Sequence, residues 1–185
     1  MTRLWLTVAI LAMSAAVSAQ SFFKNQPPRI ALDVRVEGAL SAPSRTAHVT
    51  VSATPTSGVH VYAPGNADYV PVSVAVTPVD GLAIGSPVFP PGEHYFFAPL
   101  KQAVKVYSKR FAVRIPVKAS AEFLKRAAGE SVAVTGVVSY QACDDKVCFP
   151  PQTMPFTAEL PLRQKSAPKP VTRADRAGDV SGDQR

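Results

Sequence analysis

The chain has 185 residues, 46% of them hydrophobic, so it is long and apolar enough to bury the core of one domain. Two cysteines are too few for a small protein held together by a disulfide framework. The formal net charge is +7, but the basic residues are scattered and have no aromatic residues among them, so the charge predicts solubility and weak attraction to anionic surfaces, with no nucleic-acid partner.

The first 19 residues have the pattern of a signal peptide. Arg3 precedes an apolar run from Leu4 to Val17 and small residues follow, so we expect cleavage between Ala19 and Gln20. The run is shorter than the roughly 20 residues that span a membrane, and an uncleaved N-terminal anchor is the alternative. No other stretch is apolar enough to span a membrane. The sequence thus predicts a periplasmic or secreted protein, in a compartment where disulfides form.

Most of the remaining chain has the pattern of short strands. Residues 20–29 contain Pro27 and Pro28 and are expected to form a flexible lead-in. From Ile30 to Leu162, apolar and polar residues alternate in short segments, which is the period of a strand with one buried face. Turn signals separate these segments, so we expect an all-β, immunoglobulin-like sandwich over residues 30–162. The expected strands are residues 30–37, 47–53, 59–64, 70–76, 82–88, 103–107, 110–118, 131–142 and 152–162.

One short helix and a tail complete the chain. The helix is expected from Ser120 to Ala128, because Ser120 can cap its N-terminus and Gly129 can end it. A helix of about two and a half turns is too short to form a layer of the fold, so we expect it to connect two strands. Residues 163–185 carry charges, prolines and glycines without apolar periodicity, which predicts a disordered basic tail.

Both cysteines lie in one stretch between two expected strands. If those strands pair as a hairpin closed by Asp144 to Val147, Cys143 and Cys148 face each other. Directly opposed residues of an antiparallel pair have Cα atoms about 4.5–5.5 Å apart. A disulfide needs roughly 4.4–6.8 Å, so the spacing permits a bridge across the hairpin.

Three roles remain open for the two cysteines. A structural staple that closes so short a loop contributes only about 2 kcal/mol. A redox pair is also consistent, because a hairpin tip is open to a partner's thiolate. Asp144 and Asp145 disfavour a thiolate at Cys143, so Cys148 is expected to be the better nucleophile. A metal site would need further ligands, for which His60 and His94 are the candidates in space.

The cysteine stretch resembles the N-terminal, periplasmic domain of the thiol:disulfide interchange protein DsbD. The similar residues are Tyr140-Gln141-Ala142-Cys143 and Cys148-Phe149-Pro150-Pro151. Two further segments are similar to that family, Gly58 to Tyr62 and Val106 to Phe111. Together these matches run from about Arg29 to Leu162.

The resemblance implies an immunoglobulin-like fold in which Cys143 and Cys148 cycle between dithiol and disulfide. It implies electrons received from a thioredoxin-like domain and passed to periplasmic thiol proteins, such as disulfide isomerases and the thioredoxin-like proteins of cytochrome c biogenesis. It also implies that aromatic side chains form a cap over the cysteines. The alternative is that the same side chains are ordinary residues of the hydrophobic core. The implied cap residues are Tyr95, Phe96 and Phe97, and the residues that support the hairpin are Tyr62, Tyr140 and Phe149.

We therefore expect a stand-alone, monomeric exported carrier of the thiol–disulfide oxidoreductase type, with thioredoxin-like or other periplasmic thiol proteins as partners. The alternative is a non-catalytic binding or adaptor sandwich whose disulfide pins a hairpin. The sequence has no hydrolase motif, phosphate-binding loop or cofactor fingerprint, so we expect no cofactor and no metal.

Overall fold

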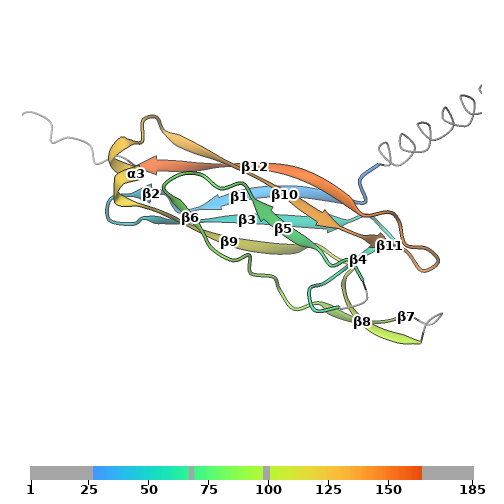
Figure 1. The fold of residues 1–185 in the computed structure, drawn as a ribbon. Helices are drawn as coiled ribbons and strands as arrows, with labels where there is room; N and C mark the ends of the chain where they lie inside the picture. The colour runs from blue at the N-terminus through green and yellow to red at the C-terminus, as the bar shows by residue number, and fades with distance from the viewer. Residues whose placement is uncertain (1–26, 67–68, 98–100, 164–185) are drawn as a thin grey trace, which may run out of the picture.

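The computed structural model describes residues 27–66, 69–97 and 101–163, and the expected signal peptide and nearly all of the expected tail lie outside these ranges. The described residues form the predicted all-β sandwich with one short helix, α3 (Ala121–Arg126) (Figure 1). Within the described part of the chain, no helix is long and apolar enough to cross a membrane. The strands are β1 (Ile30–Glu37), β2 (Leu40–Ser41), β3 (Thr46–Pro55), β4 (His60–Tyr62), β5 (Ser73–Val76), β6 (Leu82–Ile84), β7 (Glu93–Phe97), β8 (Gln102–Tyr107), β9 (Phe111–Ala119), β10 (Ser131–Tyr140), β11 (Ala142–Cys143) and β12 (Gln152–Arg163).

Two four-stranded sheets make the body of the sandwich. One has the order β1-β3-β9-β6 and the other β2-β12-β10-β5. The long pairs are antiparallel, and β2 joins β12 in parallel through Leu40 and Leu162. Along the long strands β3, β9, β10 and β12, residues that point inward alternate with exposed or half-buried ones, as the sequence period requires. The largest fully buried aliphatic side chains of this core are Leu40, Val49, Val51, Val61, Val72, Val113, Ile115, Val117, Val134 and Leu160.

A third sheet, of order β11-β4-β8-β7, extends one end of the sandwich. Figure 1 shows these strands at the end opposite α3 and β2. A small second core lies on this sheet, formed by Tyr62, Val104, Val106 and Cys143 with Tyr69 and Tyr95 packed against them. This cluster is separate from the main core, and it places one cysteine among aromatic side chains.

Several boundaries differ from the expected ones. The helix ends at Arg126 and not at Ala128, although Ser120 caps it by accepting the Phe123 N–H at 3.0 Å. The strand expected over residues 70–76 begins only at Ser73, and the one expected over 82–88 ends at Ile84. The aromatic run from Tyr95 to Phe97 belongs to a strand, β7, that the alternation rule misses because consecutive aromatics hide the period.

Candidate redox site

The two cysteines form a disulfide across a tight hairpin. Cys143 and Cys148 are opposed as an antiparallel bridge, with an S–S distance of 2.02 Å and a Cα–Cα distance of 4.0 Å. The Cα atoms are closer than the expected 4.5–5.5 Å. The hydrogen bonds explain part of the difference: Asp144 N–H donates to Val147 O at 3.0 Å and Phe149 N–H to Ala142 O at 2.8 Å. These flanking bonds make the cysteines a non-hydrogen-bonded pair, the closer of the two antiparallel types.

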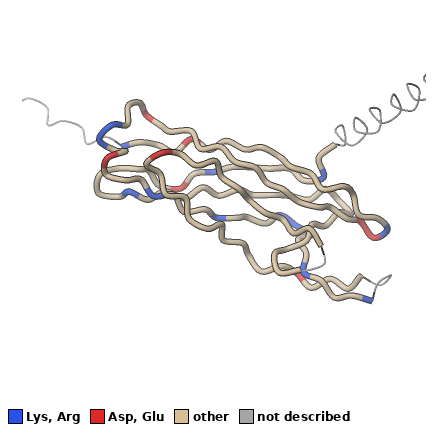
Figure 2. Tube along the Cα trace, viewed as in Figure 1, with Lys and Arg blue, Asp and Glu red and all other residues tan. Residues whose placement is uncertain are grey.

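The loop between the cysteines is shaped by the side chain of Asp144. Its Oδ1 accepts the backbone N–H groups of Lys146 and Val147, each at 2.8 Å. These hydrogen bonds favour the ionised carboxylate and lower the pKa of Asp144. Figure 2 shows acidic and basic residues side by side at the tip of this loop. The loop is therefore a charged, hydrogen-bonded turn that brings the second cysteine back over the first.

The two sulfur-bearing residues differ in exposure. Cys143 is 1% exposed because β11 pairs with β4 and is covered by the aromatic cluster. Cys148 is exposed, on the outgoing side of the loop. A thiolate that approaches from solvent therefore meets Cys148 first, and Cys143 is the sulfur that the fold encloses.

Tyr62 lies against both sulfurs. Its hydroxyl oxygen is 3.6 Å from Cys143 Sγ and 3.7 Å from Cys148 Sγ. Sulfurs joined in a disulfide carry no proton, so the hydroxyl is the donor in both contacts. Burial raises the pKa of Tyr62 to about 12, so the hydroxyl keeps its proton at neutral pH. The ring stacks on Tyr69, with centroids 4.1 Å apart, and Tyr69 in turn donates its hydroxyl to the side chain of Gln102.

The candidate cap residues have different surroundings. Tyr95 donates its hydroxyl to Asp145 Oδ1 at 2.9 Å, which links β7 directly to the cysteine loop. That hydrogen bond is the main reason that the pKa of Tyr95 is raised. Phe96, the next residue of the strand, is 62% exposed, and Phe97 is half-buried. Of the three, Tyr95 is the side chain held against the cysteine loop by a hydrogen bond.

His60 is the residue of β4 paired with Cys143. Its side chain is 5% exposed, and its ring contacts those of Tyr95 and Tyr62, with centroids 4.6 and 5.8 Å away. Burial lowers the pKa of His60, and the nearby carboxylates of Asp145 and Asp144 oppose that effect. The sequence pointed to this histidine only as a metal-ligand candidate. Its position two residues before Tyr62 puts both side chains on one face of the strand, which is the signal that could have placed it here.

The other hairpin-support candidates hold the base of the hairpin. Tyr140 is fully buried; its hydroxyl accepts the Arg29 N–H at 3.0 Å and donates to Gln152 Oε1 at 2.6 Å. The guanidinium of Arg29 lies over the ring of Phe149, 3.9 Å from its centroid. The two aromatics therefore bind the start of the domain to the strands on either side of the cysteine loop.

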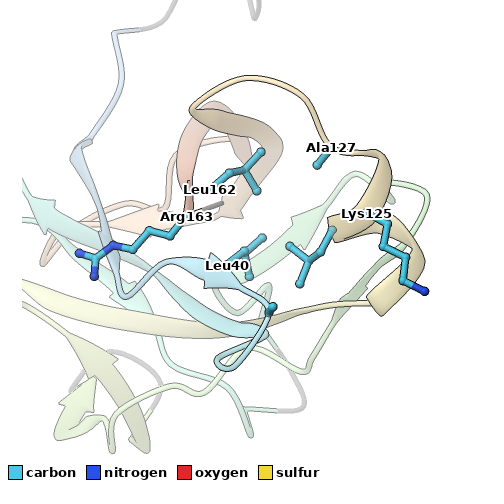
Figure 3. Close-up of a pocket in the computed structure, with 7 residues that line it drawn as sticks. Leu40, Lys125, Ala127, Leu162 and Arg163 are labelled. Carbon is cyan, nitrogen blue, oxygen red and sulfur yellow. The ribbon is translucent and has the colours of Figure 1, made fainter. Parts of the chain in front are cut away.

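A cavity of about 370 Å³ lies at the opposite end of the sandwich (Figure 3). It is formed where α3 meets the ends of β2 and β12, and it contains none of the expected site residues. The side chains that line it are Leu40, Ala42, Leu124, Lys125, Ala127, Leu162 and Arg163.

Comparison with known proteins gives one family. Residues 14–160 match the family model described as "Thiol:disulfide interchange protein DsbD, N-terminal", which includes both cysteines and the strands around them. No curated protein matches the chain. Among solved structures, the chain is similar to the GAE domain of yeast GGA1, at 13% identity and a TM-score of 0.40 over 74% of this chain and 96% of that one. The GAE domain of GGA2p from Saccharomyces cerevisiae gives 11% identity and a TM-score of 0.39 over 72% and 92%.

Proposed function

Because the chain belongs to the family of DsbD N-terminal domains, we propose that it is a thiol–disulfide carrier in which Cys143 and Cys148 exchange electrons with partner thiol proteins. The observation that carries this proposal is the unequal exposure of one disulfide, with Cys148 open to solvent and Cys143 enclosed beside the Tyr62 hydroxyl. A bridge that only pinned the hairpin would not need an exposed sulfur above a buried hydrogen-bond donor.

The exchange reaction follows from this arrangement. A partner thiolate attacks Cys148 Sγ, the Cys143–Cys148 bond breaks, and its electron pair leaves on Cys143 Sγ. The partner is then joined to Cys148 in a mixed disulfide. The Tyr62 hydroxyl lies 3.6 Å from Cys143 Sγ and can donate to the thiolate as it forms. The partner's second thiolate attacks its own bonded sulfur and releases Cys148, so the partner is oxidised and the domain reduced by two electrons.

Strand β7 limits access to this chemistry. Tyr95 packs on His60 and is hydrogen-bonded to Asp145, so a partner that approaches the disulfide from that side has to displace it. Tyr95 is half-buried and its hydrogen bond is exposed, so the displacement costs only about 0.5–1.5 kcal/mol. We assign Tyr95 the main role in the cap, with Phe96 and Phe97 of the same strand as its flanks.

The proposed partners are thioredoxin-like or other periplasmic thiol proteins, and the proposed location is the periplasm, with the leader removed after Ala19. Two exposed apolar residues suit the docking of such a partner: Val147, next to Cys148, is 54% exposed, and Phe96, next to Tyr95, is 62% exposed. Exposed apolar side chains beside a reactive group are typical of an interaction surface. We propose a monomeric carrier that engages one partner at a time.

Trapping a mixed disulfide tests the proposal. In the Cys143→Ser variant, reduced Cys148 can attack the disulfide of an oxidised thioredoxin-like protein, and the domain has no second thiol to complete the exchange. Alkylating the thiol that the partner releases keeps it from reversing the reaction. We expect a mixed disulfide on a non-reducing gel for Cys143→Ser and little for Cys148→Ser, whose remaining thiol is buried. If only Cys148→Ser traps the partner, the assigned order is wrong; if neither variant does, the carrier function is contradicted.

A further inference from the structure

His60 and Cys143 are directly opposed on neighbouring strands. They pair in the antiparallel register of β4 and β11, where opposed Cβ atoms lie about 4.5–5.5 Å apart and on the same face. Tyr62, two residues along β4, is on that face as well, and its hydroxyl reaches Cys143 Sγ. The imidazole and the enclosed sulfur therefore occupy neighbouring places on one side of the small sheet.

The imidazole is buried among aromatic rings and forms no hydrogen bond within the described part of the chain. His60 is 5% exposed, and its ring makes no hydrogen bond to any residue that the structure describes. Its ring contacts are with Tyr62 and Tyr95, both through aromatic packing. The ring nitrogens are not among the fully enclosed polar atoms that lack a partner, so the imidazole can exchange a proton with solvent while it lies beside the enclosed sulfur. In the dithiol state Cys143 carries an S–H group, which gives the neutral ring a hydrogen-bond donor on the opposed strand.

The other titratable groups that face His60 are poor proton acceptors for Cys143. Tyr62 of β4 and Tyr95 of β7 face the imidazole. Both hydroxyls act as hydrogen-bond donors, and the pKa values of both tyrosines are raised, so neither is available as a base. The groups from the cysteine loop are Asp144 and Asp145. The Asp144 carboxylate is bound to the turn N–H groups, and that of Asp145 accepts the Tyr95 hydroxyl.

We propose that His60 accepts the proton of the Cys143 thiol each time the domain passes its electrons to an acceptor. This deepens the proposed function and rests on it, because it assigns the proton transfer that allows the enclosed cysteine to act. A lowered pKa supports it, since a buried imidazole that stays neutral at pH 7 is available as a base.

The Cys148 thiolate attacks one sulfur of an acceptor disulfide, forms a mixed disulfide and releases the acceptor's other sulfur as a thiolate. His60 then takes the proton from Cys143 Sγ, and the resulting thiolate attacks Cys148 Sγ. The Cys143–Cys148 bond forms as the bond between Cys148 and the acceptor breaks, and the second acceptor sulfur leaves as a thiolate. His60 returns its proton to the released thiolates or to water, so two electrons have moved to the acceptor.

The test separates formation of the mixed disulfide from its resolution. The reduced whole chain is mixed with oxidised glutathione, quenched with acid at intervals, and analysed by mass spectrometry for the glutathione adduct of Cys148 and for the internal disulfide. We expect His60→Gln to form the adduct at the wild-type rate and to resolve it about a hundredfold more slowly at pH 7, the lower end for general base catalysis. His48→Gln, a half-exposed histidine on β3, is the matched control and should resolve as the wild type does.

The pH profile gives a readout that a packing role would not move. Wild-type resolution should be level above the lowered His60 pKa and fall as pH drops through it. In His60→Gln it should instead rise continuously with pH, because without the base the rate follows the small fraction of Cys143 that ionises by itself. Equal resolution rates for wild type and variant, or a pH profile of the same shape in both, would overturn the proposal. Wild-type protein that never forms or resolves the adduct would instead count against the carrier function itself.

A second measurement needs no variant and applies even if His60→Gln does not fold. The imidazole of His60 is titrated by NMR in the disulfide and in the dithiol states, with His48 as the internal reference. A Cys143 S–H that donates to the neutral ring stabilises that form, so the His60 pKa should be lower in the dithiol state. An identical His60 titration in the two states would contradict the proposal.

Discussion

The hydroxyl oxygen of Tyr62 is nearly equidistant from the two sulfurs of the disulfide, 3.6 Å from Cys143 Sγ and 3.7 Å from Cys148 Sγ. Tyr62 is 2% exposed, so this donor is held in an apolar cluster and not in water. A fixed donor beside a bond that breaks to give a buried thiolate stabilises the charge as it develops.

Replacing Tyr62 by Phe removes that donor and keeps the ring. Hydrogen bonds to charged groups contribute about 1.5–3 kcal/mol, so reduction of the disulfide by dithiothreitol should be about 10- to 150-fold slower in Tyr62→Phe. The rate is followed by the appearance of free thiols. Tyr69→Phe is the matched control, because the Tyr69 hydroxyl binds Gln102 and not a sulfur. A Tyr62→Phe rate equal to that of the control would show that the hydroxyl has no part in the exchange.

Replacing Tyr95 by Phe removes the hydrogen bond that ties β7 to the cysteine loop. An exposed neutral bond is worth about 0.5–1.5 kcal/mol, so the open state should become more populated and reduction by a bulky thioredoxin about two- to tenfold faster. The smaller dithiothreitol should gain less, because it needs less opening. If thioredoxin reacts at an unchanged rate with both Tyr95→Phe and Asp145→Ala, this hydrogen bond does not control access.

The hydroxyl of Tyr140 should matter for stability and not for exchange. In Tyr140→Phe the Arg29 N–H and the Gln152 side chain lose a buried partner, which should cost about 1–3 kcal/mol of unfolding free energy. Urea unfolding of the oxidised protein measures the change, and the reduction potential should stay at the wild-type value. A loss below about 0.5 kcal/mol would mean that water replaces the hydroxyl without cost.

The turn at Asp144 should respond to acid. Its pKa is lowered in the folded protein, so the carboxylate adds stability above its unfolded pKa, near 3.8, and that stability is lost as pH falls through the lower folded value. Asp144→Asn keeps a side-chain oxygen for the turn but has no charge to titrate. We therefore expect the wild type to be the more stable of the two at pH 7 and the gap to close below about pH 3.8. A constant gap from pH 7 to pH 2, measured by thermal unfolding, would refute this role.

The strands were predictable because their residues alternate. The segment 30–37 became β1 with the same bounds, and the hairpin register that opposes Cys143 and Cys148 followed from the spacing of the turn. The strand β7 was missed because Tyr95, Phe96 and Phe97 are all aromatic, so the period of two is hidden by residue type.

The surroundings of the disulfide were less predictable than the disulfide itself. The pairing of His60 with Cys143 joins residues more than 80 positions apart, and nothing local in either segment specifies it. The stacking of Tyr69 on Tyr62 depends in the same way on how the chain returns to the small sheet. The unequal exposure of the two cysteines is also a property of the packed cluster, so the sequence could suggest a redox pair without showing which sulfur is enclosed.

The reduction potential of the Cys143–Cys148 pair tests the central claim most directly. The whole chain is equilibrated in thiol buffers of defined potential and its free thiols are counted. A carrier must gain and lose electrons with other exchange proteins, so we predict a value between about −180 and −270 mV. A value below about −300 mV, typical of bridges that serve structure alone, would contradict the account and favour an adaptor domain whose disulfide only pins the hairpin.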